Sequence, residues 1–374
     1  MLYYQTSPYL QLHNTGESLC VKNLVNDEVL QADTAGWRVL EHCTSPVKAD
    51  MLVQMFDEPL FKRVTAGQFI LETGLIWQAH RYRYVDIEVS THCNWKCEYC
   101  PNRSFSQAEA YMGLQLFENI VQKLKDYGKT EYVTLNAFNE PTLDPYFFER
   151  LRILQQACIK LVLMTNGSYL DKKKADALKE SNIIEVLWFN LPSVDSDVFR
   201  QMTGWHDFET VIKNIDYCID IGLNVRFAVQ GKTSNIGSDL QSIKEKYQNR
   251  VRQPIEKWET TDRAGLLDNE YNLGVNIPSP YMFGCPTALH NLCIGIGGEI
   301  MACFNDYHKE FVIGNINDGT IEEIATSPGV IRHKQKVFGV IPVEPGFICR
   351  KCIRMKSAKL LSRYMSRIRL KTQA

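Results

Sequence analysis

The sequence predicts an α/β protein whose main part is built on a parallel sheet. Apolar stretches with the period of a strand alternate with stretches of helical period over residues 80–265. Strands separated by helices of about 10–15 residues form βαβ units, whose strands lie parallel in one sheet. In such sheets, ligands bind at the C-terminal strand ends, where the connecting loops gather.

The composition is that of an ordinary globular chain. Its 374 residues are enough for two to three domains of about 150 residues each. A hydrophobic share of 45% and a charged share of 23% exclude a disordered or fibrous chain. Lys and Arg (42) balance Asp and Glu (43), so we expect no nucleic-acid partner. The sequence has no apolar run long enough to span a membrane and no signal peptide, which predicts a cytoplasmic protein.

Residues 1–78 predict a small α+β module. The expected order is a turn and short helix over residues 29–40, a second helix over residues 51–61 and a strand-rich end over residues 69–77. Asp33 or Thr34 could cap the first helix by accepting a backbone N–H.

Residues 79–268 carry the strand and helix alternation. The expected strands are residues 84–90, 132–136, 161–164, 184–190, 224–229 and 255–259. The expected helices are residues 114–124, 145–159, 171–180 and 208–219.

The last quarter differs in composition, and we divide it into residues 269–355 and a tail of residues 356–374. The first part is richer in Gly and Cys, with hairpin signals at Gly297 and Gly298. From Arg350 onward the chain has nine Lys or Arg residues and no acid, which indicates a basic amphipathic helix.

The chain has twelve cysteines, which in a cytosolic protein of this size are metal ligands or core residues rather than a disulfide framework. Cys93, Cys97 and Cys100 follow the first strand with spacings of three and two residues. Three thiolates so placed can converge on one inorganic cluster, and on a four-iron cube they leave one iron open. A zinc loop or three packed cysteines are the alternatives.

This loop resembles the signature C-x3-C-x-aromatic-C of the radical SAM superfamily. The resemblance implies a partial (β/α)6 barrel and a [4Fe–4S] cluster on the three cysteines. The open iron would bind S-adenosylmethionine. An external one-electron reductant such as flavodoxin or ferredoxin would drive its cleavage to a 5′-deoxyadenosyl radical, which abstracts a hydrogen from the substrate.

The segment Asn139-Glu140-Pro141 resembles the family's Gly-Glu-Pro motif, which cradles the methionyl amine. Asn replaces the Gly, a mild departure because Asn tolerates positive φ better than most residues. The resemblance implies that Glu140 offers a carboxylate to an ammonium group.

Further positions resemble the family's S-adenosylmethionine contacts. Asn166 lies in a Thr-Asn-Gly that ends the third strand, Asn190 and Ser193 follow the fourth strand near the expected ribose, and Tyr99 matches an aromatic residue near the adenine. The segment from Arg263 to Gly265 resembles the Arg-Ala-Gly that precedes the C-terminal extension in one branch.

A second set of cysteines consists of Cys285, Cys303, Cys349 and Cys352. A tight hairpin at Gly298 could bring Cys303 back beside Cys285, and four thiolates suit either zinc or a fully ligated [4Fe–4S] cluster. The segment resembles the SPASM/Twitch extension of radical SAM enzymes. No cysteine follows Cys352, so the resemblance implies the shorter Twitch form with one auxiliary [4Fe–4S] cluster.

The other cysteines have simpler interpretations. Cys293 could replace Cys285 as a ligand, donate a hydrogen atom, or pack in the core. Cys218 lies on the apolar stripe of a helix and is expected in the core. Cys20, Cys43 and Cys158 are expected to be structural.

Three functions remain open from the sequence. Residues 1–78 resemble a PqqD-like peptide-recognition element, which binds a leader peptide by β-augmentation. This predicts an oxidoreductase that matures a ribosomally synthesised peptide. The alternatives are a radical SAM dehydrogenase or epimerase on a small molecule such as a cyclitol or sugar alcohol, and a non-catalytic zinc-stabilised binding protein. Arg226, Asp306 and His308 could face the cavity, but the sequence identifies no catalytic residue.

Overall fold

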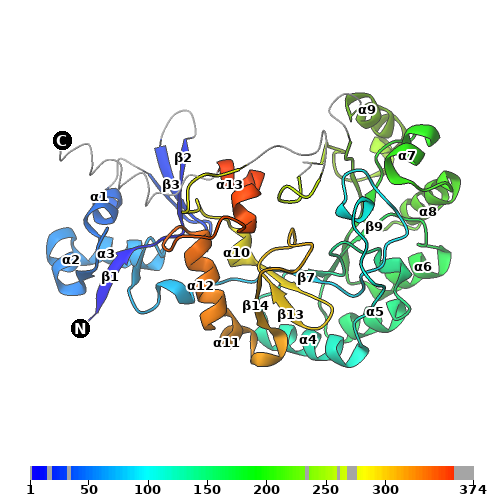
Figure 1. Cartoon of the computed structure of the whole chain (residues 1–374). Coiled ribbons are helices and arrows are strands. Elements are labelled where there is room, and N and C mark those ends of the chain that lie inside the picture. Colours follow the sequence, from blue (N-terminus) through cyan, green and yellow to red (C-terminus); the bar gives the residue numbers. More distant parts are fainter. Residues whose placement is uncertain are drawn as a thin grey trace. The chain divides into compact units, whose positions relative to one another are not determined.

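The computed structural model describes residues 2–14, 19–31, 35–231, 236–258, 262–267 and 276–357. The chain divides into two compact units, each made of separate segments. The colours of Figure 1 follow the sequence from the N-terminus (blue) to the C-terminus (red). The first unit comprises Met1–Arg81, Asn276–His290 and Ala325–Ala374, and the second comprises Tyr82–Val275 and Asn291–Ile324. The predicted residues Asp33 and Thr34 and the C-terminal tail beyond residue 357 lie outside the described residues.

The N-terminal segment of the first unit forms two small antiparallel sheets and three helices. One sheet has the order β5-β1-β6 and the other the order β2-β3-β4. The strands are β1 (Tyr3–Thr6), β2 (Leu10–Asn14), β3 (Leu19–Asn23), β4 (Val29–Gln31), β5 (Val47–Lys48) and β6 (Ile70–Glu72). The helices are α1 (Ala35–His42), α2 (Ala49–Phe56) and α3 (Glu58–Ala66).

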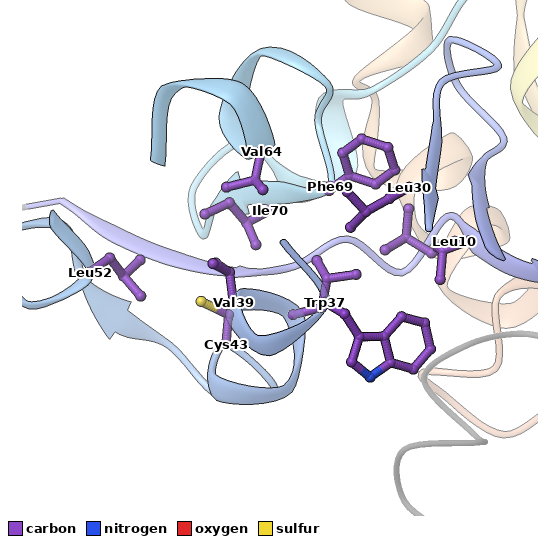
Figure 2. Packing of buried hydrophobic residues seen from close by; sticks show 11 residues of the cluster. Leu10, Leu30, Trp37, Val39, Cys43, Leu52, Val64, Phe69 and Ile70 are labelled. Carbon is purple, nitrogen blue, oxygen red and sulfur yellow. The ribbon is translucent and has the colours of Figure 1, made fainter. Parts of the chain in front are cut away.

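A shared core joins these elements. Figure 2 shows side chains from β2, β4, all three helices and β6 pointing toward one another. Trp37 and Val39 enter the core from α1, and Cys43, just after that helix, is fully buried, so it is structural as predicted. Burial raises the pKa of the Cys43 thiol to about 12, which keeps the thiol neutral. Burying these apolar side chains is the main force that stabilises the module.

The single helix expected over residues 51–61 is two helices. The chain breaks at Asp57, whose φ is 67°, and a helix cannot continue through that conformation. The Asp57 carboxylate accepts a hydrogen bond from the backbone N–H of Leu60 at 2.8 Å and so caps α3, which has Pro59 in its first turn. The six strands also exceed the few expected, because each is too short to show a clear period of two.

The C-terminal segments of the first unit are mostly helical. They contain α10 (Thr287–His290), α12 (Pro328–Val337) and α13 (Ile353–Ser357). Lys334 on α12 is fully buried, and its ammonium donates to the carbonyls of Trp77, Ala79 and Ala325 at 3.0–3.2 Å. Burial lowers the pKa of Lys334 to about 8, because the charged form is desolvated.

The second unit confirms the predicted α/β class and the partial (β/α)6 barrel. Its sheet has the order β11-β10-β9-β8-β7-β12-β13-β14, and the strands from β7 to β11 pair parallel to one another in sequence order. The parallel strands are β7 (Tyr84–Ile87), β8 (Tyr132–Thr134), β9 (Leu161–Thr165), β10 (Ile184–Asn190) and β11 (Val225–Ala228). The helices between and after them are α4 (Leu114–Tyr127), α5 (Phe147–Gln156), α6 (Lys172–Ser181), α7 (Ser196–Thr203), α8 (Phe208–Asp220) and α9 (Ile236–Tyr247).

The expected helices bury the stripes that predicted them. Phe117, Ile120 and Leu124 of α4 and Ile215 of α8 are at most 1% exposed, and Cys218 is in the core as predicted. Helices α7 and α9 were not predicted, because each is short and has few apolar residues.

Two further predictions in this unit need correction. The sixth strand expected over residues 255–259 is only a bridge between Val229 and Lys257, and residue 259 lies outside the described part of the chain. Cys158 is exposed with a φ of 55°, because it lies in the turn after α5 rather than in the core.

An antiparallel extension completes the sheet. Strand β12 (Asn291–Ile294) pairs parallel with β7, and β13 (Glu299–Met301) and β14 (Val312–Asn315) follow it antiparallel. The predicted hairpin at Gly298 joins β12 to β13. Gly298 has a φ of 88°, a conformation that favours glycine. No helix among the described residues is long and apolar enough to cross a membrane.

Candidate functional site

The loop that carries Cys93, Cys97 and Cys100 is held against helix α7. The indole of Trp95 is 1% exposed and packs edge-on against Phe199, with ring centroids 5.1 Å apart. The backbone N–H of Lys96 donates to the carbonyl of Thr203 at 2.8 Å. Helix α7, which sequence reasoning missed, is therefore the platform that fixes the shape of this loop.

The three cysteines of the loop line one pocket. Burial raises the pKa of each thiol, to about 12 for Cys93, and for Cys97 the two neighbouring thiols add to the rise. A metal reverses this effect, because its charge favours the thiolate that binds it. Three mutually close thiols in a buried pocket are therefore a donor set that an iron–sulfur cluster fits.

The three thiols share the pocket without meeting at a single point. Among the described residues, no three His, Cys, Asp or Glu side chains converge closely enough to hold one metal ion. An iron–sulfur cube is larger than one ion and takes its thiolates on separate irons. A polynuclear cluster on Cys93, Cys97 and Cys100 therefore does not require the three thiols to meet at one point.

The pocket lies at the C-terminal ends of the parallel strands, as the fold class predicts. Asn136 lies two residues beyond β8, Thr165 ends β9 and Asn190 ends β10, and all three line the pocket. Asn136 also fixes the spacing of two strand ends, because its side-chain amide exchanges two hydrogen bonds with the backbone of Met164, at 2.8 and 3.1 Å.

Glu140 is buried at the wall of the pocket and joins two loops. One carboxylate oxygen accepts hydrogen bonds from the Thr142 backbone and hydroxyl and from the Thr165 hydroxyl, and the other accepts from the Asn166 backbone. Burial raises the pKa of this carboxyl, and these hydrogen bonds oppose the rise. The sequence predicted that this carboxylate faces an ammonium group. In the structure, its hydrogen bonds hold the loop after β8 against the loop after β9.

Asn139 differs from the expectation based on the missing glycine. It is absent from the described residues with positive φ, so the position does not need the conformational freedom of glycine. Its side-chain amide instead accepts from the Ala137 N–H at 2.8 Å and donates to the Leu135 carbonyl at 3.0 Å. Pro141 begins the short helix Pro141–Leu143 and is buried behind the pocket wall.

The other predicted contacts with S-adenosylmethionine divide into two groups. Tyr99, Asn166 and Asn190 line the pocket with the cysteines, and the Tyr99 hydroxyl donates to Asn190 at 3.1 Å. Ser193 lies elsewhere, because its hydroxyl accepts from the Asp195 N–H at 3.0 Å and the side chain is 1% exposed. Its role at the ribose stays an untested prediction.

Gln230, Phe138 and Arg263 are among the pocket residues that were not singled out as contacts from the sequence. Gln230, just beyond β11, and Phe138 line the pocket, and so does Arg263, whose guanidinium carbon lies 5.8 Å from the centre of the Phe138 ring. The charge of Arg263 also opposes the rise in the pKa of Cys100. Only Arg263 had a signal in the sequence, its Arg-Ala-Gly segment; the other two depend on the fold.

The second set of cysteines is divided between the two units. Cys285, Cys349 and Cys352 belong to the first unit, where Cys285 and Cys352 are close enough for one thiol to raise the pKa of the other. Cys303 belongs to the second unit. There it interacts with Cys293, which is buried beside Asp86 with a sulfur to oxygen distance of 3.6 Å.

Two residues considered as possible cavity groups have structural roles. The Asp306 carboxylate accepts the backbone N–H groups of Glu310 and Phe311 at 3.1 and 2.8 Å. The His308 ring packs edge-on against Phe105, with centroids 4.9 Å apart. Neither lines the pocket of the three cysteines.

Comparison with known families accounts for both sets of cysteines. The model of the Radical SAM superfamily matches residues 87–237, and that of SPASM, an iron–sulfur cluster-binding domain, matches residues 285–353. The chain carries a domain of the radical SAM superfamily and, C-terminal to it, a SPASM-type domain. The matches confirm the predicted cofactors, iron–sulfur clusters and S-adenosylmethionine.

Individual relatives are distant. The chain is 29% identical to a GTP 3′,8-cyclase of Pasteurella multocida over 146 residues, which are 38% of this chain and 42% of the relative. It therefore spans less than half the length of that curated relative. A 2-deoxy-scyllo-inosamine dehydrogenase of Niallia circulans, which depends on S-adenosyl-L-methionine, is 21% identical over 248 residues, covering 65% of this chain and 82% of the relative.

A solved structure resembles nearly the whole chain. It is SuiB of Streptococcus suis bound to the precursor peptide SuiA, with a TM-score of 0.58, 13% identity and 94% of each chain covered. At this identity the likeness shows that the fold is shared.

Proposed function

We propose that this protein is a radical SAM oxidoreductase that modifies a ribosomally synthesised peptide. The observation that carries the enzyme class is the set of three thiols from one loop, which share a buried pocket at the C-terminal ends of the parallel strands. The superfamily match supports the same class.

The residues of the pocket have distinct proposed roles. Cys93, Cys97 and Cys100 would hold a [4Fe–4S] cluster. When bound, the cluster and S-adenosylmethionine would supply the radical chemistry that removes a hydrogen atom from the substrate, using one electron from a reductant such as flavodoxin or ferredoxin. Tyr99, Asn139, Glu140, Pro141, Asn166 and Asn190 would bind S-adenosylmethionine or shape its site. The buried wall would exclude water from the reacting groups.

Cys285, Cys303, Cys349 and Cys352 would hold one auxiliary [4Fe–4S] cluster. This assignment rests on their order in the sequence and on the SPASM match over residues 285–353. We propose the role of electron acceptor for this cluster, which would make the overall modification an oxidation.

The peptide substrate is supported by the N-terminal module. Strand β4 ends the sheet β2-β3-β4, and Val29 on it is 51% exposed. The Asn23 N–H donates to the Glu28 carbonyl, so the Glu28 carbonyl faces β3. In an antiparallel sheet, hydrogen-bonded residue pairs alternate with pairs that are not hydrogen-bonded. The next pair, Val29 with Lys22, is therefore not hydrogen-bonded, and the backbone N–H of Val29 faces away from β3. Such an edge can pair with an added peptide strand. The shared fold with peptide-bound SuiB supports the same substrate class.

The first test is the iron content and the 5′-deoxyadenosine yield of the full chain after anaerobic reconstitution. We expect about eight irons per chain, from two four-iron clusters, and 5′-deoxyadenosine after reduction with S-adenosylmethionine present. About four irons would contradict the auxiliary cluster. Zinc in place of iron, with no cleavage, would contradict the enzyme class and favour the zinc-stabilised binding protein.

The dehydrogenase relative favours a second candidate, oxidation or epimerisation of a small molecule such as a cyclitol. A displayed random-peptide library, selected on the full chain, separates the two. For a peptide enzyme, enriched peptides should bind the wild type and the control Val29→Ala but lose at least about tenfold in affinity for Val29→Pro, which removes the outward N–H. Equal binding to all three proteins, or no enrichment, would favour the small-molecule candidate.

A further inference from the structure

The second unit has another cavity, of about 350 Å³, which the proposed chemistry does not use. It lies between strands β10 and β11 and the segment of residues 251–258. We call it the Trp188 cavity. Its walls include the side chains of Trp188, Arg226, Ile255, Glu256 and Trp258.

This cavity lies on the same face of the sheet as the pocket of the three cysteines. Side chains two residues apart on a strand point to the same face, so Trp188 lies on the face of Asn190, which lines the cysteine pocket. Trp188 pairs with Arg226 in the parallel register, and Arg226 lies on the face of Gln230, four residues on. Two residues of strand correspond to about 6–7 Å, so one extended molecule can reach both places.

Arg226 is the partly buried cation of this cavity, whose lining also includes the exposed side chains of Glu256 and Lys257. Its guanidinium carbon lies 5.5 Å from the centre of the Trp188 ring. Its Nε is buried with no hydrogen-bond partner, and no carboxylate among the described residues lies within ion-pair distance of it. Arg150 and Arg250 of the same unit, in contrast, are paired with Asp144 and with Asp216 and Asp220. A buried donor without an acceptor is costly, which points to an acceptor supplied from outside the chain.

The walls beside Arg226 are aromatic. Trp188 and Trp258 pack at 80° with ring centroids 4.7 Å apart, and both are partly exposed in the cavity. Such rings bind a flat or apolar group, whereas the planar fork of a guanidinium binds the two oxygens of an oxyanion. The cavity thus combines an aromatic wall with one guanidinium that has no ion-pair partner among the described residues, next to the exposed charges of Glu256 and Lys257.

We propose that the Trp188 cavity anchors the substrate by a carboxylate next to an apolar or aromatic group, with Arg226 binding the carboxylate. This inference rests on the proposed function, since it places the rest of the substrate near the cysteine pocket. A peptide carries such carboxylates on its acidic side chains and C-terminus. A phosphate offers Arg226 similar oxygens, so the experiment must separate the two anions.

The test is a fluorescence titration of the reconstituted full chain, using the tryptophans of the cavity as reporters. The probes are benzoate, its neutral counterpart benzamide, and phenyl phosphate. We expect saturable quenching by benzoate, with an affinity at least about tenfold higher than for benzamide or phenyl phosphate. Arg226→Gln should lose at least about tenfold in benzoate affinity. The benzoate affinity of Arg226→Lys should lie between those of the wild type and Arg226→Gln, because lysine keeps the positive charge but not the planar guanidinium.

The matched control is Arg152→Gln, an exposed arginine on α5 that is not part of the cavity. It should bind benzoate as the wild type does. Equal affinity for benzoate and benzamide, no saturable quenching, or unchanged binding by both Arg226 variants would overturn the proposal. A clear preference for phenyl phosphate would overturn the assignment to a carboxylate.

A second readout separates this inference from the proposed function. This readout is 5′-deoxyadenosine formation by the wild type with no substrate present, which depends on the cysteine pocket, and Arg226 does not line that pocket. If the wild type forms none while benzoate binds as expected, the enzyme class fails and the anion site stands. If the wild type cleaves S-adenosylmethionine but does not bind benzoate, only the anchor fails.

Discussion

The two sets of cysteines are specified by the sequence in different ways. Cys93, Cys97 and Cys100 lie within eight residues, on one loop that packs on α7, and they line one pocket of the second unit. In the other set, Cys285, Cys349 and Cys352 come from two segments of the first unit, and Cys303 comes from the second unit. A short loop brings its thiols together by local spacing, whereas the second set depends on how distant segments fold.

The largest effect we expect distinguishes the two sets by function. Cys97→Ser should abolish 5′-deoxyadenosine formation and remove about four irons, because the loop loses one of only three ligands. Cys352→Ser should also remove about four irons but leave the cleavage of S-adenosylmethionine in place, while product formation from the substrate is lost. The measurements are iron per chain and 5′-deoxyadenosine yield with and without substrate.

Cys158→Ser is the matched control for both variants, because Cys158 is exposed and belongs to neither set. It should keep about eight irons and full cleavage. Loss of cleavage in Cys352→Ser with the iron of the first cluster intact would show that the two sets are coupled. The division of roles between them would then be wrong.

The sequence predicted the features of this site that depend on local spacing, and it missed those that depend on how distant segments fold. The alternation of strands and helices, the position of the loop after the first strand and the shared pocket of its cysteines all followed from spacing and periodicity. The platform of α7 did not, because this helix has only eight residues, too few for Phe199 and Met202 to establish a repeating helical pattern. Phe138 and Gln230 lie in the loops after β8 and β11 and reach the pocket through the path of these loops, which local patterns do not contain.

Residues near a motif were also harder to place than the motif itself. Ser193 follows the same strand as Asn190, yet only Asn190 points into the pocket, because the chain turns at this point and the Ser193 hydroxyl accepts from Asp195. Asn139 was expected to replace a glycine in a strained conformation, but its side chain is used for hydrogen bonds instead. In both cases a local hydrogen bond decided the outcome, and a motif does not record such bonds.

Substitution of Glu140 should have a smaller effect, on the stability of the pocket that holds Cys93, Cys97 and Cys100. Its two carboxylate oxygens accept four hydrogen bonds, which join the loops after β8 and β9. In Glu140→Gln, one oxygen becomes an NH2 group that faces donors, so we expect a loss of about 2–3 kcal/mol in the free energy of unfolding. Urea unfolding of the wild type and the variant measures this loss.

The same variant tests whether Glu140 also serves the cofactor. If it only joins the loops, the affinity of the folded, iron-loaded protein for S-adenosylmethionine should fall less than about tenfold. Cys93, Cys97 and Cys100 should then still take up about four irons. If it also pairs with an ammonium group, the affinity should fall by at least about tenfold in folded, iron-loaded protein, because a charge-assisted hydrogen bond is lost. Thr142→Val, which removes only a hydroxyl bond to the same carboxylate, is the matched control. It should weaken folding by about 1 kcal/mol and leave the affinity unchanged, so a fall in affinity in Glu140→Gln alone would identify the carboxylate charge as the cause.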